Sequence, residues 1–86
     1  MEEAKGKIGV KILSESGKLY DEPASCVFVP TSRGEIAILP YHTPMISKLA
    51  KGAIFIVESH HRKKIVDIDK GLVRVDDNQV VVLVNL

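Results

Sequence analysis

The sequence predicts an all-β protein, a sandwich or a barrel of about nine or ten short strands. Val and Ile together number 20, whereas Ala, Leu and Met number 14. β-branched residues favour pleated sheet over helix, because their side chains are stiff and pack well on a half-buried surface. Turn signals recur every 5–12 residues, and apolar residues follow no helical period. Such spacing is typical of sandwiches and barrels.

The length predicts one domain spanning residues 1–86. A chain of this size buries roughly 60–65% of the surface that its unfolded form exposes, so its apolar side chains must share one core. The hydrophobic share of 45% can supply that core. The sequence shows no repeat, linker or low-complexity segment.

The first predicted strand is residues 8–12, where apolar and polar side chains alternate. Residues 14–17 have turn composition and end in glycine. Residues 18–22 form a second strand, and Pro23 limits it to an edge or an end because proline lacks an N–H donor. Residues 24–29 form a third strand, apolar enough to be buried on both faces, and Pro30 ends it.

The second half of the chain continues this alternation of strands and turns. A polar turn at 31–34 precedes a strand at 35–39, and Pro40 and Pro44 make residues 40–44 an extended crossover of fixed shape. The remaining predicted strands are 45–50, 53–58, 64–69, 72–75 and 79–83. Because residues 80–84 are all apolar, we expect a central strand covered on both faces.

Charge and composition exclude several classes of protein. The net charge of +1 provides no strong field for nucleic acid or an anionic membrane. One cysteine indicates a reducing compartment and no disulfide scaffold. The acidic N-terminus lacks the apolar stretch of a secretory signal, and the longest apolar runs have five residues. A membrane-spanning helix needs about 20.

The histidine, cysteine and basic residues of the sequence do not form a pattern that predicts a catalytic, metal or cofactor site. His60 and His61 are adjacent, so on a strand they would face opposite sides and chelate poorly. His42 stands alone between two prolines, and Cys26 lies in an apolar run that favours a buried, inert thiol. The basic run 60–64 indicates a solvated hairpin that blocks edge-to-edge pairing. These features favour a non-catalytic interaction module.

One segment carries a family resemblance. Residues 26–46, CVFVPTSRGEIAILPYHTPMI, resemble the signature of the epsilon subunit of F-type ATP synthases, and residues 39–44, LPYHTP, are the most specific part. Residues 49–56, 70–75 and 78–83 are similar to later family motifs, so the likeness spans about 7–85. Thr31 stands where the family often has glycine; a β-branched residue would be strained if that position needed a positive φ.

The resemblance implies a flattened β-sandwich of two roughly five-stranded sheets. It implies a non-catalytic rotor subunit that binds the gamma subunit and the c-ring, coupling ion-driven rotation to ATP synthesis. Such a subunit would be monomeric when isolated, present once per complex and peripheral on the cytoplasmic face of the energy-coupling membrane. By position, the residues facing the c-ring would be Thr31, Ser32, Arg33, Gly34, Glu35, Ile36 and Ala37. Those facing gamma would be Ser14, His42, Thr43 and Ser47.

Two further expectations accompany this resemblance. The family commonly adds a C-terminal helical hairpin, whereas this sequence ends directly after the last predicted strand. We therefore expect no C-terminal helical domain, no self-inhibition by helix extension and no nucleotide site. The alternative function is a stand-alone adaptor or carrier-type module, which would need a modifiable lysine on a hairpin tip; Lys70 comes nearest to that pattern.

Overall fold

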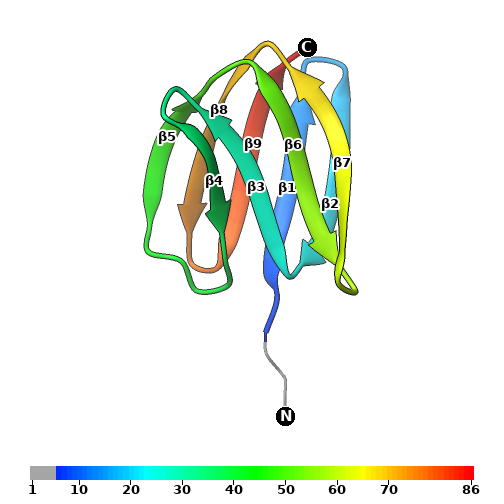
Figure 1. The fold of residues 1–86 in the computed structure, drawn as a ribbon, viewed down its shortest axis with the longest axis vertical. Coiled ribbons are helices and arrows are strands. Elements are labelled where there is room, and N and C mark those ends of the chain that lie inside the picture. Colours follow the sequence, from blue (N-terminus) through cyan, green and yellow to red (C-terminus); the bar gives the residue numbers. More distant parts are fainter. Residues whose placement is uncertain (1–5) are drawn as a thin grey trace.

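The computed structural model describes residues 6–86, which form nine strands in two facing sheets and confirm the predicted β-sandwich (Figure 1). We predict no secretory signal because the N-terminus is acidic, but that segment lies outside the described residues. The strands are β1 (Ile8–Ser14), β2 (Gly17–Ala24), β3 (Cys26–Thr31), β4 (Gly34–Ile38), β5 (Met45–Leu49), β6 (Gly52–Glu58), β7 (His61–Ile68), β8 (Lys70–Asp76) and β9 (Gln79–Asn85).

The two sheets differ in size and in strand order. The five-stranded sheet has the order β2-β1-β9-β8-β5, and the four-stranded sheet has the order β4-β3-β6-β7. β1 and β9 pair in parallel, with Gly9 opposite Gln79, while the other neighbours are antiparallel. The first and last strands therefore lie side by side at the centre of one sheet (Figure 1).

Prolines and corners explain where the strand boundaries differ from the predicted ones. The second sheet has four strands rather than about five, and the segment between Ile38 and Met45 crosses between the sheets without adding a strand, as predicted. The segment is not extended throughout, because the chain makes a tight turn in which Tyr41 has a φ of +62°. Pro40 and Pro44 remove two backbone donors from that segment. The bounds predicted for the third strand, 24–29, are wrong. Ala24 ends β2, the chain passes to the other sheet at Ser25, and β3 continues through Pro30, which was expected to end it, to Thr31. β2, which contains Pro23, is an edge strand as predicted.

The core lies between the inner faces of the sheets and consists almost entirely of Val and Ile. Ile12 and Val82 from one sheet and Val27 and Ile56 from the other are each 0% exposed. Within residues 6–86 no polar or charged residue is buried. The sandwich is therefore stabilised by apolar burial, at roughly 25 cal/mol per Å².

The expectation that residues 80–84 are covered on both faces is wrong. Val80, Val82 and Val84 are buried, but Leu83 between them is 48% exposed. β9 is central within its sheet, as predicted, yet only one face of that sheet packs against the other layer. An apolar run therefore does not by itself require two covered faces.

Two substitutions of the same residue type separate core burial from surface exposure. We expect Ile56→Ala, at a fully buried position, to lower the free energy of unfolding by about 3 kcal/mol, because it loses apolar burial and leaves a cavity. Ile46→Ala, at a position that is 69% exposed, should change it by less than about 1 kcal/mol. Urea unfolding of both variants measures the difference. Equal losses would contradict the packing described.

A polar contact ties the two sheets together near the β2 edge. The Tyr20 hydroxyl, on β2, donates a hydrogen bond of 3.0 Å to Glu58 Oε2, on β6. Burial of the hydroxyl and, secondarily, this bond to a carboxylate raise the pKa of Tyr20 to about 12. The folded protein thus retains a proton that the unfolded chain, with an ordinary tyrosine pKa near 10, releases.

This proton linkage predicts an alkaline loss of stability. Between about pH 10 and pH 12 the unfolded state binds fewer protons than the folded state, so the free energy of unfolding falls as the pH rises. We expect a loss of about 1 kcal/mol, since solvent screens a partly exposed hydroxyl. Tyr20→Phe should flatten this part of the stability curve, whereas Tyr41→Phe, at a ring 75% exposed, should not. Equal slopes for the wild type and Tyr20→Phe would refute the linkage.

Candidate interaction surfaces

The β3–β4 hairpin holds the seven residues that the resemblance places against a c-ring. The Thr31 hydroxyl accepts a 3.2 Å hydrogen bond from the Arg33 N–H and donates a 2.7 Å bond to the Gly34 carbonyl. The positive φ of this turn, +115°, falls on Gly34 and not on Thr31. Thr31 is therefore unstrained and shapes the turn with its side chain.

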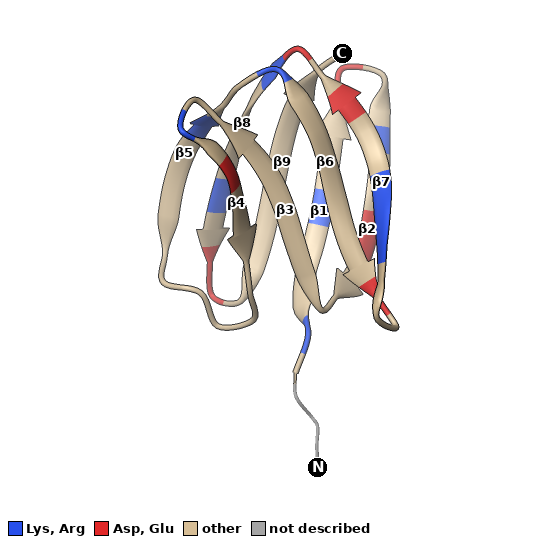
Figure 2. Ribbon diagram, in the orientation of Figure 1, with Lys and Arg blue, Asp and Glu red and all other residues tan. Residues whose placement is uncertain are grey.

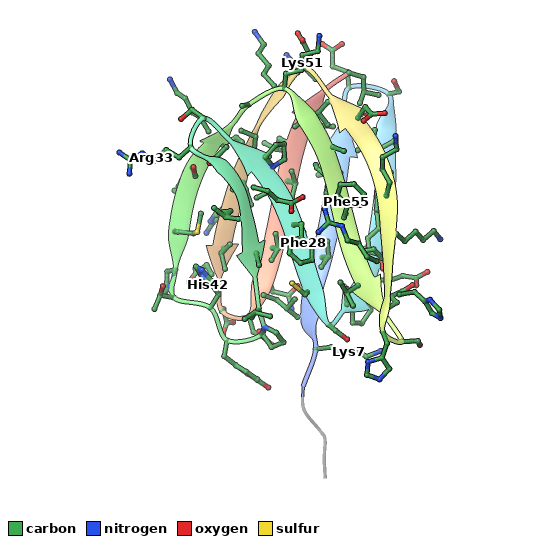
Figure 3. All side chains as sticks on the ribbon, in the orientation of Figure 1. Lys7, Phe28, Arg33, His42, Lys51 and Phe55 are labelled. Atoms are coloured by element: carbon green, nitrogen blue, oxygen red, sulfur yellow. The ribbon has the colours of Figure 1, made fainter. Side chains whose placement is uncertain are left out.

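The predicted c-ring-facing residues are not equally available. Ser32 and Arg33 are exposed at the tip, where Figure 3 shows Arg33 projecting away from the sandwich. Glu35 and Ala37 are also exposed, whereas Ile36 packs against the core. Glu35 also has a partner, because Arg62 Nη2 lies 2.6 Å from its Oε2 atom.

The proline-bracketed crossover is held in a defined shape by short hydrogen bonds. The His42 N–H donates to the Leu39 carbonyl at 3.1 Å, and the Tyr41 N–H donates to Asn78 Oδ1 at 2.7 Å. The Nδ1 atom of His42 lies 2.7 Å from the Thr43 carbonyl oxygen. A carbonyl only accepts, so Nδ1 carries the proton in this contact and Nε2 is left as an acceptor in the neutral ring.

The four predicted gamma-facing residues do not form one cluster. His42 and Thr43 lie at the end of the five-stranded sheet where Gly9 meets Asn78, and Ser14 ends β1 at the opposite end (Figures 1 and 3). Ser47 is half-buried on β5, which is an edge strand. Ser14, His42 and Thr43 therefore lie at the two ends of this sheet, whereas Ser47, directly opposite the buried Val73, faces the inner side of the sheet.

The outer face of the five-stranded sheet carries an apolar strip. Strand register places Leu13 opposite Leu83 and Leu83 opposite Leu72. In the neighbouring row, Val81 and Ile46 flank Arg74. We define the apolar strip as Leu13, Ile46, Leu72, Val81 and Leu83. Ile46, Leu83 and Leu72 are 69%, 48% and 39% exposed. Leu72 and Leu83 are neighbours in one row, and Ile46 lies in the next row beside Arg74.

Cations flank this strip. Lys48 ends the row of leucines, and Lys11 and Arg74 share the row of Val81 and Ile46. Figure 2 shows these positive positions on β1, β5 and β8. A shallow groove lined by Leu13, Leu72 and Leu83 lies at one end of the strip. An apolar sheet face bordered by charge is typical of a protein-binding surface.

The reactive side chains lie elsewhere and are not assembled into one site. Cys26 is buried as predicted, and burial raises the pKa of its thiol. His60 and His61 are exposed at the β6–β7 turn. Within residues 6–86, no group of three or more His, Cys, Asp or Glu side chains is placed to hold a metal ion. Lys70 begins β8 directly after β7 in the other sheet, so it does not sit on the hairpin tip that a carrier domain needs.

Sequence reasoning missed two features of these surfaces. The basic run 60–64 is exposed as predicted, but Arg62 within it stacks on two aromatic rings of the four-stranded sheet. The second feature is the apolar strip: the sequence pattern predicts residues 80–84 to be covered and gives no role to Leu13 or Leu72. Its signal was present in the alternation of β8, where exposed Leu72 and Arg74 alternate with buried Val73 and Val75.

A β-sandwich with one exposed apolar sheet face has the architecture of a protein-binding domain. Residues 7–86 match the family described as ATP synthase, Delta/Epsilon chain, beta-sandwich domain. The chain belongs to this family, as the resemblance implied.

Relatives agree with this assignment. The chain is 34% identical over 77 residues to the ATP synthase epsilon chain of Campylobacter concisus, covering 90% of this chain and 60% of that one. It is 36% identical over 78 residues to that of Desulfitobacterium hafniense, covering 91% and 58%. The chain thus spans about 60% of the length of these curated relatives.

Solved structures share the fold. A chain of the Euglena gracilis mitochondrial ATP synthase, in a structure of OSCP, F1 and c-ring, aligns with a TM-score of 0.84 at 19% identity, covering 96% of this chain and 53% of that one. A chain in the central stalk and c-ring of the Tetrahymena thermophila mitochondrial enzyme aligns with a TM-score of 0.75 at 20% identity, covering 95% and 66%. Within residues 6–86 no helix is long and apolar enough to cross a membrane.

Proposed function

We propose that this chain is a non-catalytic subunit of the central stalk of an F-type ATP synthase. It binds the gamma subunit and the c-ring and so couples ion-driven rotation to ATP synthesis. Family membership supports the assignment to the ATP synthase, and its relatives carry the name epsilon chain. The observation that carries the binding role is the apolar strip on the outer face of the five-stranded sheet, which leaves leucines in water unless a partner covers them.

The apolar strip is the surface proposed to bind gamma. Its side chains stand on β1, β9, β8 and β5, so their positions are set by strand pairing and little conformational entropy is lost on docking. Of the residues predicted to face gamma, Ser14 lies at one end of this sheet and His42 and Thr43 lie at the other. Ser47 is on the edge strand β5 but faces the inner side of the sheet, so it is not part of this surface. Lys11, Lys48 and Arg74 lie in the same rows and would set register more than affinity.

The β3–β4 hairpin is the surface proposed to face the c-ring. Its tip is exposed, and the two hydrogen bonds of the Thr31 hydroxyl hold its turn in shape. It projects from the end of the sandwich opposite the 39–44 crossover (Figure 3), so one domain could contact two partners at once. The subunit would then be peripheral to the membrane on its cytoplasmic face, with one copy per complex and a monomeric isolated form.

A charge placed in the apolar strip tests the gamma surface. Leu83→Asp should weaken binding to the gamma subunit from the same source by at least about tenfold, because a carboxylate would be desolvated at an apolar contact. Ser59→Asp is the matched control: it adds the same charge at an exposed turn of the other sheet, where φ is +51° and aspartate is tolerated. Titration calorimetry measures both affinities.

Thermal unfolding must accompany this measurement, since Leu83 is partly buried. Equal affinities for Leu83→Asp and Ser59→Asp, with both variants folded, would remove the apolar strip from the interface. Failure of the folded wild-type chain to bind gamma at all would reject the stalk assignment.

Disulfide crosslinking in the assembled enzyme tests the hairpin orientation. Ser32→Cys, at the exposed tip, should crosslink to cysteines placed in the loop of the c subunit. Ser59→Cys, at the opposite end of the sandwich, is the control and should not. The native Cys26 is 7% exposed and its thiol pKa is raised by burial, so it should remain unreactive. Crosslinks from Ser59→Cys alone would mean that the domain is oriented the other way round.

A further inference from the structure

Four side chains form a continuous line across the outer face of the four-stranded sheet. Phe28 on β3 lies directly opposite Phe55 on β6, and both rings are half-buried. The guanidinium of Arg62, on β7, lies over both rings, with Cζ 4.4 Å and 4.0 Å from their centroids. Its Nη2 atom then donates to Glu35 Oε2, on β4, at 2.6 Å. Figure 3 shows Phe28 and Phe55 side by side on neighbouring strands.

This arrangement, which we name the Arg62 strap, connects the two edges of the sheet. β7 and β4 are the edge strands, with β6 and β3 between them. Arg62 therefore reaches from one edge across both aromatic rings to a carboxylate on the other edge. Figure 2 shows its partner, Glu35, as the negative position on β4.

The strap is stronger than an ordinary surface ion pair. Exposed pairs contribute little to stability, because two long side chains must be ordered in water. The two side chains of this pair are 43% and 39% exposed, but the guanidinium rests on two ring faces that already restrict it. Each such cation–π contact is favourable, because the negative face of the ring attracts the guanidinium. Arg62 is thus held in place before it meets Glu35.

The strap changes the charge that the β3–β4 hairpin presents. Glu35 follows the exposed tip, yet its charge is paired within the domain. Among the ion pairs of residues 6–86, Arg33 takes part in none. The hairpin therefore offers one cation to a partner, with the neighbouring anion withdrawn against the sheet.

We propose that Arg62 is a positioning residue for the hairpin. It holds the Glu35 carboxylate against the sheet, so that Arg33 is the charged side chain of the hairpin that contacts the partner. The partner surface therefore presents acidic side chains or carbonyl oxygens to Arg33. This inference rests on the proposed c-ring contact and specifies the chemistry of that partner. It also assigns a role to the basic run 60–64 beyond keeping a sheet edge in water.

The test uses the crosslink from Ser32→Cys to the c-subunit loop in the assembled enzyme, in which Glu35 and Arg62 remain intact. Adding Arg62→Gln frees the Glu35 carboxylate beside the tip and should lower the crosslinking yield by about threefold or more, through repulsion of an oxygen-rich partner surface. Lys63→Gln is the matched control: it removes the same charge from β7, opposite Ile56 rather than Val57, and should leave the yield unchanged.

The same experiment in a Glu35→Gln background separates positioning from a general structural effect. If Arg62 acts through Glu35, Arg62→Gln should cause little further loss once the carboxylate is gone. Equal fractional losses in both backgrounds, or no loss in either, would overturn the inference.

Nuclear magnetic resonance of the chain alone keeps the strap testable if the c-ring contact fails. Stacking on Phe28 and Phe55 should shift the Arg62 side-chain protons upfield, and Phe55→Leu should reduce that shift. Random-coil shifts in the wild type would overturn the strap itself. An upfield shift without any crosslink from Ser32→Cys would instead reject the c-ring contact and the partner chemistry inferred here.

Discussion

The whole structure depends on one geometric constraint: in a two-layer sandwich, each sheet can bury only one of its faces. The buried faces are filled by Val and Ile, whose branched side chains interlock between the layers, with Ile12, Val27, Ile56 and Val82 all excluded from water. Every second residue of every strand therefore points outward. What stands at those outward positions decides what each face can do.

The two outer faces differ in whether their apolar side chains are covered by the domain itself. The five-stranded sheet leaves the apolar strip uncovered, as expected for a face that a partner will bury. The four-stranded sheet also presents aromatic side chains outward, but covers them from within the domain with the guanidinium of Arg62. One face thus leaves apolar side chains exposed, and the other covers its aromatic rings with a side chain of its own sheet. The central parallel pairing of β1 and β9 brings Leu13 beside Leu83 and so makes the apolar strip continuous across these two strands.

Much of the fold could be predicted from local pattern. The alternation along β1, the prolines around the crossover and Pro23 at the edge each act within a few residues, so the existence and approximate position of each strand followed directly, although several strand ends differ. Local pattern did not predict which faces of the strands are buried. Residues 80–84 have no polar alternation. Local pattern therefore could not distinguish a strand covered on both faces from one in which the outward-facing Leu83 is exposed. The single strand expected at 24–29 failed for a related reason, since a corner at Ser25 looks locally like a polar residue within a strand.

The sequence by itself determined the class of fold, the positions of the strands and, through the family signature, the protein family. It also identified the β3–β4 hairpin and the crossover as candidate interaction segments, because sequence motifs and turns depend on consecutive residues. Only the tertiary structure decided which outward residues become neighbours. Glu35 and Arg62 are 27 residues apart, and strand order alone brings them to opposite edges of one sheet within reach of each other. Side-chain partnership across a sheet depends on which strands pair, and that choice is made by the burial of the whole core rather than by any local segment.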